Sequence, residues 1–154
     1  MLLTPAQLAA HAIRVKARAI ARAAVEALYD ARPDLAQRYG DAGRRHCAKD
    51  LGHHLRFLAA AVELDDPKVF TDYAAWAARV MVTHKVAPED ALVSFRCLLA
   101  AAPPAVPARS ADAVRRILTS AVRHLESHPP RAPRRPRAEP GPFALRVAQT
   151  PSRS

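Results

Sequence analysis

The chain is poor in the residues on which several classes of protein depend. Of its 154 residues only 5% are aromatic, and only two are cysteine, Cys47 and Cys97. Two cysteines so far apart in the sequence cannot make a disulfide framework or a zinc knuckle. No aromatic residues are interleaved with the basic ones and no base-reading motif is present, so we expect no specific nucleic-acid binding.

Long apolar runs and recognisable catalytic sets are also missing. The opening segment, MLLTPAQLAAHAIRVKARAIARA, carries a charge every few residues. It therefore resembles neither a signal peptide nor a membrane span, and we expect a cytoplasmic protein with no membrane contact. No pair of carboxylates, no nucleotide-binding glycine loop and no Ser/His/Asp set is visible, so we expect no enzyme and no metal site.

The residues that are abundant indicate an all-α fold. Half of the chain is hydrophobic, much of it alanine. Alanine, leucine and arginine favour helix, and no segment alternates like a strand. Residues 1–127 are predicted to form one domain. Residues 128–154 hold six arginines against one glutamate, which is +5 of the net +10, together with seven of the 14 prolines. They are predicted to be a disordered basic tail, with Phe143–Leu145 as a short docking motif.

Helix start and stop signals divide the domain into about five main helices. Thr4 caps a helix that Pro33 stops, and Asp66 and Ser110 are natural caps for later ones. Gly40 and Gly43 mark a break after a short helical turn at 34–40. The predicted helices span residues 5–31, 44–64, 67–84, 88–101 and 110–127. The apolar residues of segment 5–31 occupy more than one face of the predicted helix, which suggests that part of it packs on a partner chain.

The segment HCAKDLGHHLR, residues 46–56, contains the strongest candidates for binding or catalytic residues. On a helix Cys47, Asp50 and His54 share one face, whereas His53 points away from it. A zinc site fits poorly because Cys47 and His54 lie about 10 Å apart along the axis. A catalytic thiol would lack a base within one turn. Attachment of a cofactor fits better, and a buried free cysteine beside a polar helix flank is the structural alternative.

The segment CAKDLGHHLRFLAAAVELDDP resembles the chromophore helix of the phycobiliproteins, the globin-like bilin carriers of the phycobilisome. The resemblance implies a thioether from Cys47 to a phycocyanobilin-like bilin. It also implies a propionate contact from Lys49 and hydrogen bonds from Asp50 to the inner pyrrole nitrogens. Arg56 matches the end of the motif, and His54 is placed beside the pigment. The likeness covers roughly residues 24–126.

The chain differs in three ways from the light-harvesting (antenna) subunits of this family. His53 and His54 replace the usual tyrosine pair, the region before Cys47 is short, and the chain is basic. The chain is most similar to the phycobiliprotein-like globins of non-photosynthetic bacteria, which are associated with bilin biosynthesis. This likeness implies bilin-biosynthesis enzymes as partners and a homodimer formed through residues 5–31.

Two further readings follow from a globin-like fold, because fold does not fix function. The segment HKVAPED after a helix is similar to the end of a globin's proximal helix, so haem is the alternative cofactor. The usual proximal position, however, falls among Val80, Met81 and Val82. The other reading is a ligand-free sensor or interaction domain. Tyr73 and Trp76 are predicted either to be core or to form a second wall facing Cys47 across a flat cleft.

Overall fold

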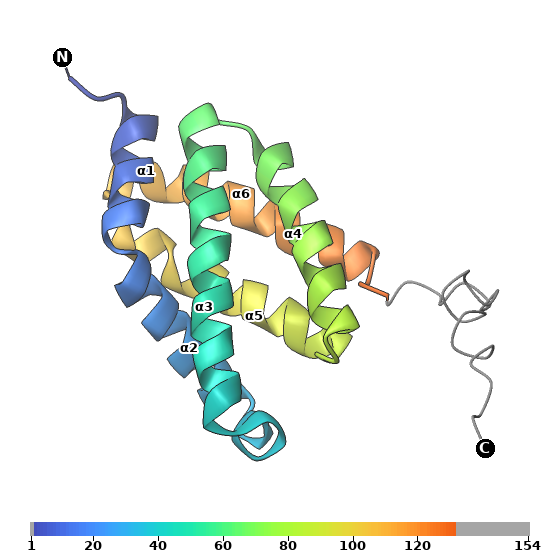
Figure 1. The fold of residues 1–154 in the computed structure, drawn as a ribbon. Helices are drawn as coiled ribbons and strands as arrows, with labels where there is room; N and C mark the ends of the chain where they lie inside the picture. Colours follow the sequence, from blue (N-terminus) through green and yellow to red (C-terminus); the bar gives the residue numbers. More distant parts are fainter. Residues whose placement is uncertain (1, 132–154) are drawn as a thin grey trace, which may run out of the picture.

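The computed structural model describes residues 2–131. Within them it contains α-helices, one short 3₁₀ turn and no strand, as the sequence predicts (Figure 1). No helix in this part of the chain is long and apolar enough to cross a membrane. The elements are α1 Pro5–Val15, α2 Ala17–Ala31, α3 Asp34–Leu64, α4 Pro67–Thr83, α5 Pro88–Ala101, η1 Pro103–Ala105 and α6 Ala108–Ser127.

Helix starts follow the local signals closely at three places. The Thr4 hydroxyl accepts a hydrogen bond from the Gln7 backbone N–H, and the Gln7 Oε1 accepts one from the Thr4 backbone N–H, which completes a capping box. Asp66 caps α4 through the Lys68 backbone N–H at 3.0 Å. Helix α5 runs over Pro88–Ala101, as predicted.

The single predicted helix over residues 5–31 is wrong. It bends at Lys16, whose φ and ψ of −95° and 10° separate α1 from α2. The bend raises the count of α-helices between residues 2 and 131 from five to six. It lets α1 pack on α3 and α6 while α2 packs on α3 and α5. The Lys16 Nζ donates a hydrogen bond to the Ala105 carbonyl at 3.0 Å, which links the bend to η1.

Two other predicted boundaries also need correction. Helix α6 begins at Ala108, and Ser110 does not cap it. The Ser110 hydroxyl instead donates to the Pro5 carbonyl at 3.4 Å, which ties α6 to the start of α1. The long helix resumes directly after Gly40 rather than at Arg44. Gly40 has a φ of 61° and a ψ of −164°, a conformation that favours glycine and makes the break inside α3.

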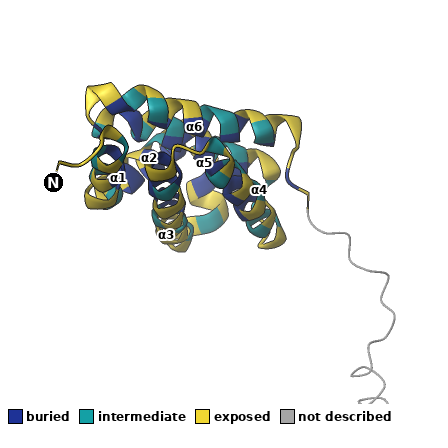
Figure 2. Cartoon of the chain, turned by 90° about the horizontal axis from the view of Figure 1, so that it is seen from above, coloured by how far each residue is buried: buried dark blue, intermediate teal, exposed yellow. Residues whose placement is uncertain are grey.

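The core lies where two groups of helices cross. In Figure 1 the axes of α1, α3 and α4 are roughly aligned, with α3 antiparallel to the other two, and α6 crosses behind them. Figure 2 shows the same crossing from above, with buried residues between the helices and exposed ones outside. Helix α3 contacts α1 and α2 on one side and α4 on the other. The largest fully buried side chains are Phe70, Phe95, Ile13, Ile20, Leu51, Leu55, Leu58, Leu98, Ile117, Leu118 and Val114.

Most apolar side chains of residues 5–31 pack within the chain. Ile13, Ile20, Val25 and Leu28 are all buried in the core, and Val15 is the large apolar side chain of α1 that stays exposed, at 68%. Self-association through this segment therefore stays a prediction. The predicted tail falls mainly on residues 132–154, which lie outside the described residues, as does its Phe143–Leu145 motif.

Candidate functional site

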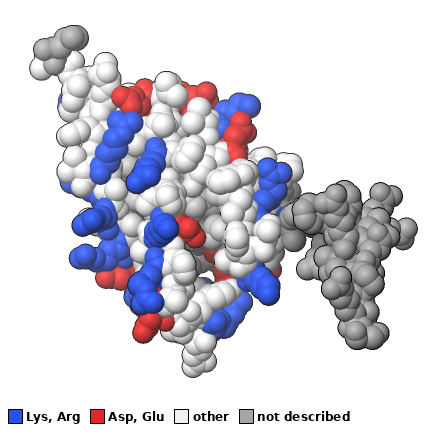
Figure 3. Space-filling model, in the orientation of Figure 1, with Lys and Arg blue, Asp and Glu red and all other residues white. Residues whose placement is uncertain are grey.

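A cavity of about 820 Å³ opens between α3 and α4. The end of α2 and the first turns of α5 close it on the remaining sides. Its volume lies within the range of about 300–1,000 Å³ that is usual for small-molecule sites. In Figure 3 the surface is hollowed over this part of the molecule, between α3 and α4. Of the residues predicted to bind a cofactor, the wall contains Cys47, Asp50, His54, Tyr73 and Trp76.

Lys49 and Arg56, the other two predicted residues, do not line the cavity. Both side chains are exposed. His53 does line it, contrary to the expectation that it would point away from the ligand face. Helical periodicity gives the order of the side chains around α3. The packing of the neighbouring helices decides how many of these side chains line the cavity. Here they include His46 and His53 as well as Cys47 and Asp50.

Cys47 presents a thiol that is protonated at neutral pH. The residue is half-buried in the wall of the cavity. Burial raises the pKa of its thiol to about 11, and the negative charge of Asp50 one turn away adds to the rise. Cys97, on α5, is buried outside the cavity wall, and burial raises its pKa as well. Both cysteines are free.

Asp50 places a carboxyl group in the cavity wall. It is half-buried, and burial raises its pKa, while the positive charges of His53, His46, Lys49 and His84 work against that rise. No ion pair reaches Asp50 among residues 2–131. A carboxylate that is partly removed from water and has no partner is destabilised. The carboxylate is therefore suited to receive N–H donors from a ligand.

His54 and Tyr73 join the two walls of the cavity. The His54 Nδ1 and the Tyr73 hydroxyl lie 2.8 Å apart, and the imidazole stacks on Phe95 with ring centroids 4.6 Å apart. Burial lowers the pKa of His54 to about 3, so its imidazole is neutral under ordinary conditions. Burial, followed by the charge of Asp50, raises the pKa of Tyr73 to about 12. This pair is a rigid and uncharged part of the site.

Aromatic side chains from both helices contribute to the cavity wall, Phe57 from α3 and Tyr73 and Trp76 from α4. Phe57 and Tyr73 stack with centroids 3.9 Å apart and an interplanar angle of 8°, and Trp76 lies 6.0 Å from Tyr73. Phe57 and Trp76 are 45% and 55% exposed, so two of the few aromatic side chains of this chain face solvent beside the cavity. A second hollow of about 380 Å³ adjoins them, lined also by Val69. The flat apolar faces are suited to a planar conjugated ligand.

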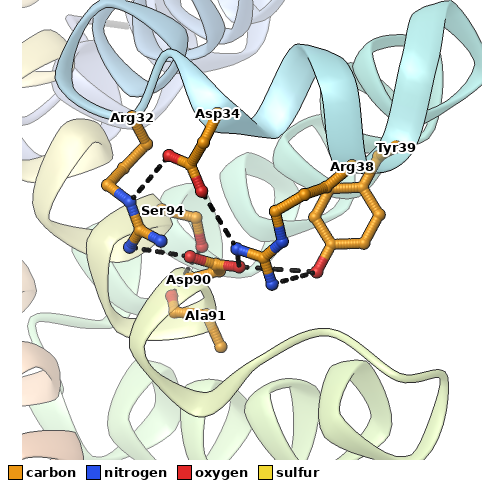
Figure 4. Close-up of polar contacts among 7 residues, drawn as sticks. All are labelled: Arg32, Asp34, Arg38, Tyr39, Asp90, Ala91 and Ser94. Carbon is orange, nitrogen blue, oxygen red and sulfur yellow. Dashed lines mark hydrogen bonds and ion pairs between the residues drawn. The ribbon is translucent and has the colours of Figure 1, made fainter.

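The far end of the cavity is closed by an ion-pair network around Asp90 (Figure 4). Asp90, at the start of α5, is 4% exposed. Arg32 and Arg38 reach it at 2.8 and 3.2 Å, and the Tyr39 hydroxyl lies 3.4 Å from it. Its Oδ1 lies at the 2.8 Å distance from Arg32 but accepts no hydrogen bond of suitable angle. That contact is therefore held by charge, and the network clamps the α2–α3 corner onto α5.

Tyr39 of this network fits against the chain at Gly43. A Cβ atom at Gly43 would collide with the Cβ of Tyr39, and it would approach the Tyr29 hydroxyl at 3.5 Å. Both Tyr39 and Gly43 line the cavity. Glycine at this position therefore lets the Tyr39 side chain lie against the part of α3 that follows the break at Gly40, and this contact sets the boundary of the cavity at its closed end.

Sequence reasoning missed His46 and His84 as site residues. Both line the cavity. The signal for His46 was present, since His46, Asp50 and His53 are spaced four and three residues apart on one helix face. His84 begins the HKVAPED segment behind the haem alternative, but nothing in the sequence placed it beside Cys47, because only the packing of α4 against α3 brings the end of α4 to this wall. Between residues 2 and 131 no group of three or more His, Cys, Asp or Glu side chains is arranged to hold a metal ion.

Comparison with known families shows which family the chain matches. The family model described as "Phycobilisome protein" matches residues 6–125, which is most of the chain. The match begins well before residue 24, where the sequence resemblance was expected to start, and therefore includes α1 and α2. No curated protein matches the chain.

Proposed function

The chain belongs to the phycobilisome protein family, and on this premise we propose that it binds a linear tetrapyrrole in the cavity between α3 and α4. Its all-α, globin-like fold is that of the family. The observation that carries the proposal is the convergence of Cys47, Asp50, Tyr73 and Trp76 on one cavity of about 820 Å³. These side chains come from two helices and meet the needs of a planar, N–H-bearing ligand.

Each wall has a distinct part in this proposal. Phe57, Tyr73 and Trp76 offer flat apolar surface to the pyrrole rings. Asp50 offers a carboxylate to pyrrole N–H groups, and its negative charge favours a protonated ligand. The His54–Tyr73 pair keeps the cavity open by holding α3 and α4 at a set distance. When bound, a bilin would supply absorption of visible light, and the chain itself would perform no reaction.

Attachment through Cys47 belongs to the same proposal. The thiol lies in the cavity wall one helical turn from Asp50. Because the thiolate is the reactive form and burial raises the pKa of Cys47 to about 11, unassisted thioether formation is expected to be slow at neutral pH. Non-covalent binding would therefore precede any attachment.

We further propose a role in bilin production or handling rather than in light harvesting, with the enzymes of bilin biosynthesis as partners. What supports it is the basic composition, with a net charge of +10, and the histidines at 53 and 54 in place of tyrosines. A cytoplasmic location suits this role.

The test is the absorption spectrum of protein co-produced with a haem oxygenase and a bilin reductase. A visible bilin band supports the proposal. A Soret band would establish haem instead, although Val80 and Met81, at the usual proximal position, present apolar groups to the cavity. Absence of both bands would leave the ligand-free interaction domain.

Two substitutions separate attachment from tuning. Cys47→Ala should give a folded protein whose pigment is released on denaturation, and Cys97→Ala is the matched control. Asp50→Asn should keep the pigment with a weaker, blue-shifted red band. Pigment that stays covalently attached in Cys47→Ala would contradict the assignment of Cys47.

A further inference from the structure

The ionisable side chains that line the cavity between α3 and α4 are mainly histidines and aspartates, an unusual set for a site that binds an acidic ligand. Its wall contains no lysine and no arginine. It contains two carboxyl groups, Asp50 and Asp90, and four imidazoles. One imidazole, His54, is buried and neutral. The other three, His46, His53 and His84, are exposed at the rim.

The three rim histidines surround Asp50 from two elements. His46 and His53 lie four residues before and three residues after Asp50 on α3, and so share its face. His84 is the C-cap of α4, on the opposite wall. Each of the three, when charged, favours the ionised form of Asp50, so each is near enough to act on a charge inside the cavity.

The remaining charged groups near the cavity cannot replace these imidazoles. Arg32 and Arg38 are already paired with Asp90 at the closed end. Lys49 acts on Asp50 but is exposed outside the wall. Arg44 acts on Cys47, but it is exposed, lies over the Tyr29 ring at 4.3 Å and is likewise outside the wall. The other titratable groups of the wall are neutral or acidic: Tyr29 from α2, Tyr39 and Cys47 from α3, and Tyr73 from α4.

We propose that His46, His53 and His84 are the carboxylate-binding rim of this cavity, so that a dicarboxylate ligand is held by imidazolium groups and its binding takes up protons. The inference rests on the proposed function, because it assigns the residues that meet the propionates of a linear tetrapyrrole. Without them, a dianion would enter a cavity whose free charge is the Asp50 carboxylate. Lysine and arginine remain cationic at all ordinary pH values, whereas imidazole changes its charge between about pH 5 and 8. Affinity should therefore fall as the pH rises through that interval.

The expected effect follows from the exposure of the rim. An exposed ion pair contributes a factor of about 2–5 to an equilibrium, and two propionates can make two or three such contacts. The dissociation constant for the dicarboxylate should thus be about 10-fold higher at pH 8.5 than at pH 6.0. A ligand without carboxylates should show less than about a 2-fold change.

Trp76 provides the measurement. It is the single tryptophan of the chain and lies in the wall of the cavity, so a bound tetrapyrrole should quench its fluorescence. The probes are biliverdin, which carries two propionates, and biliverdin dimethyl ester, which carries none. Both are titrated into the full-length protein at pH 6.0, 7.0 and 8.5. The variants are the triple substitution His46→Gln/His53→Gln/His84→Gln, the single substitution His53→Lys, and His11→Gln as a control at an exposed position of α1 outside the cavity.

Support consists of four results together. Wild type and His11→Gln bind biliverdin about 10-fold more weakly at pH 8.5 than at pH 6.0. The triple variant loses most of that pH dependence, it binds the dimethyl ester as the wild type does, and His53→Lys strengthens biliverdin binding at pH 8.5. The proposal is overturned if the triple variant and the wild type show the same pH dependence, even though both bind biliverdin. Failure of both probes to bind at any pH would instead overturn the proposed function itself.

Discussion

Replacing His54 should remove most of the acid sensitivity of folding between pH 7.5 and 5.0. Its imidazole is 3% exposed, stacks on Phe95 and contacts the Tyr73 hydroxyl through Nδ1. Burial lowers its pKa from 6.5 to about 3. The folded chain therefore excludes a proton that the unfolded chain accepts below about pH 6.5.

The sign and size of the effect follow from this difference in pKa. Stability from the neutral imidazole is fully present above pH 6.5 and is lost as the pH falls toward 3, because the unfolded state binds more protons over that interval. Each pH unit within it changes the free energy of unfolding by about 1.4 kcal/mol. Between pH 7.5 and 5.0 the loss from His54 alone amounts to about 2 kcal/mol. Carboxyl groups ionise mostly below this range.

Urea unfolding followed by far-UV circular dichroism at pH 5.0, 6.0, 7.0 and 7.5 measures the effect. His54→Gln keeps polar atoms near Tyr73 but cannot take up a proton in this range. It should be less stable than the wild type at pH 7.5, with a slope against pH that is flatter by about 2 kcal/mol over the interval. His11→Gln, at an exposed position, should keep the wild-type slope. Equal slopes for His54→Gln and wild type would refute the assignment of a buried neutral imidazole.

Three further predictions concern other parts of the molecule. Asp90→Asn should lower the free energy of unfolding by about 2 kcal/mol, because it removes the buried carboxylate that Arg32 and Arg38 share and leaves them only the half-exposed Asp34 as a charged partner. Asp112→Asn, at a 96% exposed carboxylate in a surface pair, should change it by less than about 0.5 kcal/mol. Equal effects of the two substitutions would contradict a structural role for the Asp90 network. In a Cys97→Ala variant, the rate of Cys47 alkylation by iodoacetamide should rise about 10-fold per pH unit up to pH 10. The reason is that burial raises the pKa of this thiol to about 11. A rate that stops rising near pH 8.5 would show an ordinary exposed thiol. Light scattering at high protein concentration should detect a dimer. Val15→Glu should weaken this dimer more than the control Leu64→Glu does, although both positions are 68% exposed. A monomeric wild type would rule out pairing through residues 5–31.

The family and the main helices could be predicted from sequence because their signals are local. Caps at Thr4 and Asp66 and the proline at 88 act within one helical turn, and α5 follows its signals to the residue at both ends. The Cys47-to-Asp50 spacing likewise puts both side chains on the same part of the α3 surface without reference to any other helix.

The candidate site could be predicted only in part, since periodicity orders the side chains of one helix but does not say what they face. Lys49 and Arg56 carry the charges that the sequence motif leads one to expect at the ligand, yet both side chains lie outside the cavity wall. His84 lies outside the Cys47 motif and reaches the wall because α4 packs against α3.

What the sequence determined by itself is therefore the all-α class, the helix starts and the residues that share a face of α3. Tertiary structure alone decided the bend at Lys16, the contact of Ser110 with Pro5 and the three-histidine rim of the cavity. The physical reason is the range of the interactions. Caps and helix periodicity depend on neighbours within a turn, whereas a bend, a crossing and a cavity wall depend on side chains that only the packing of distant helices brings together.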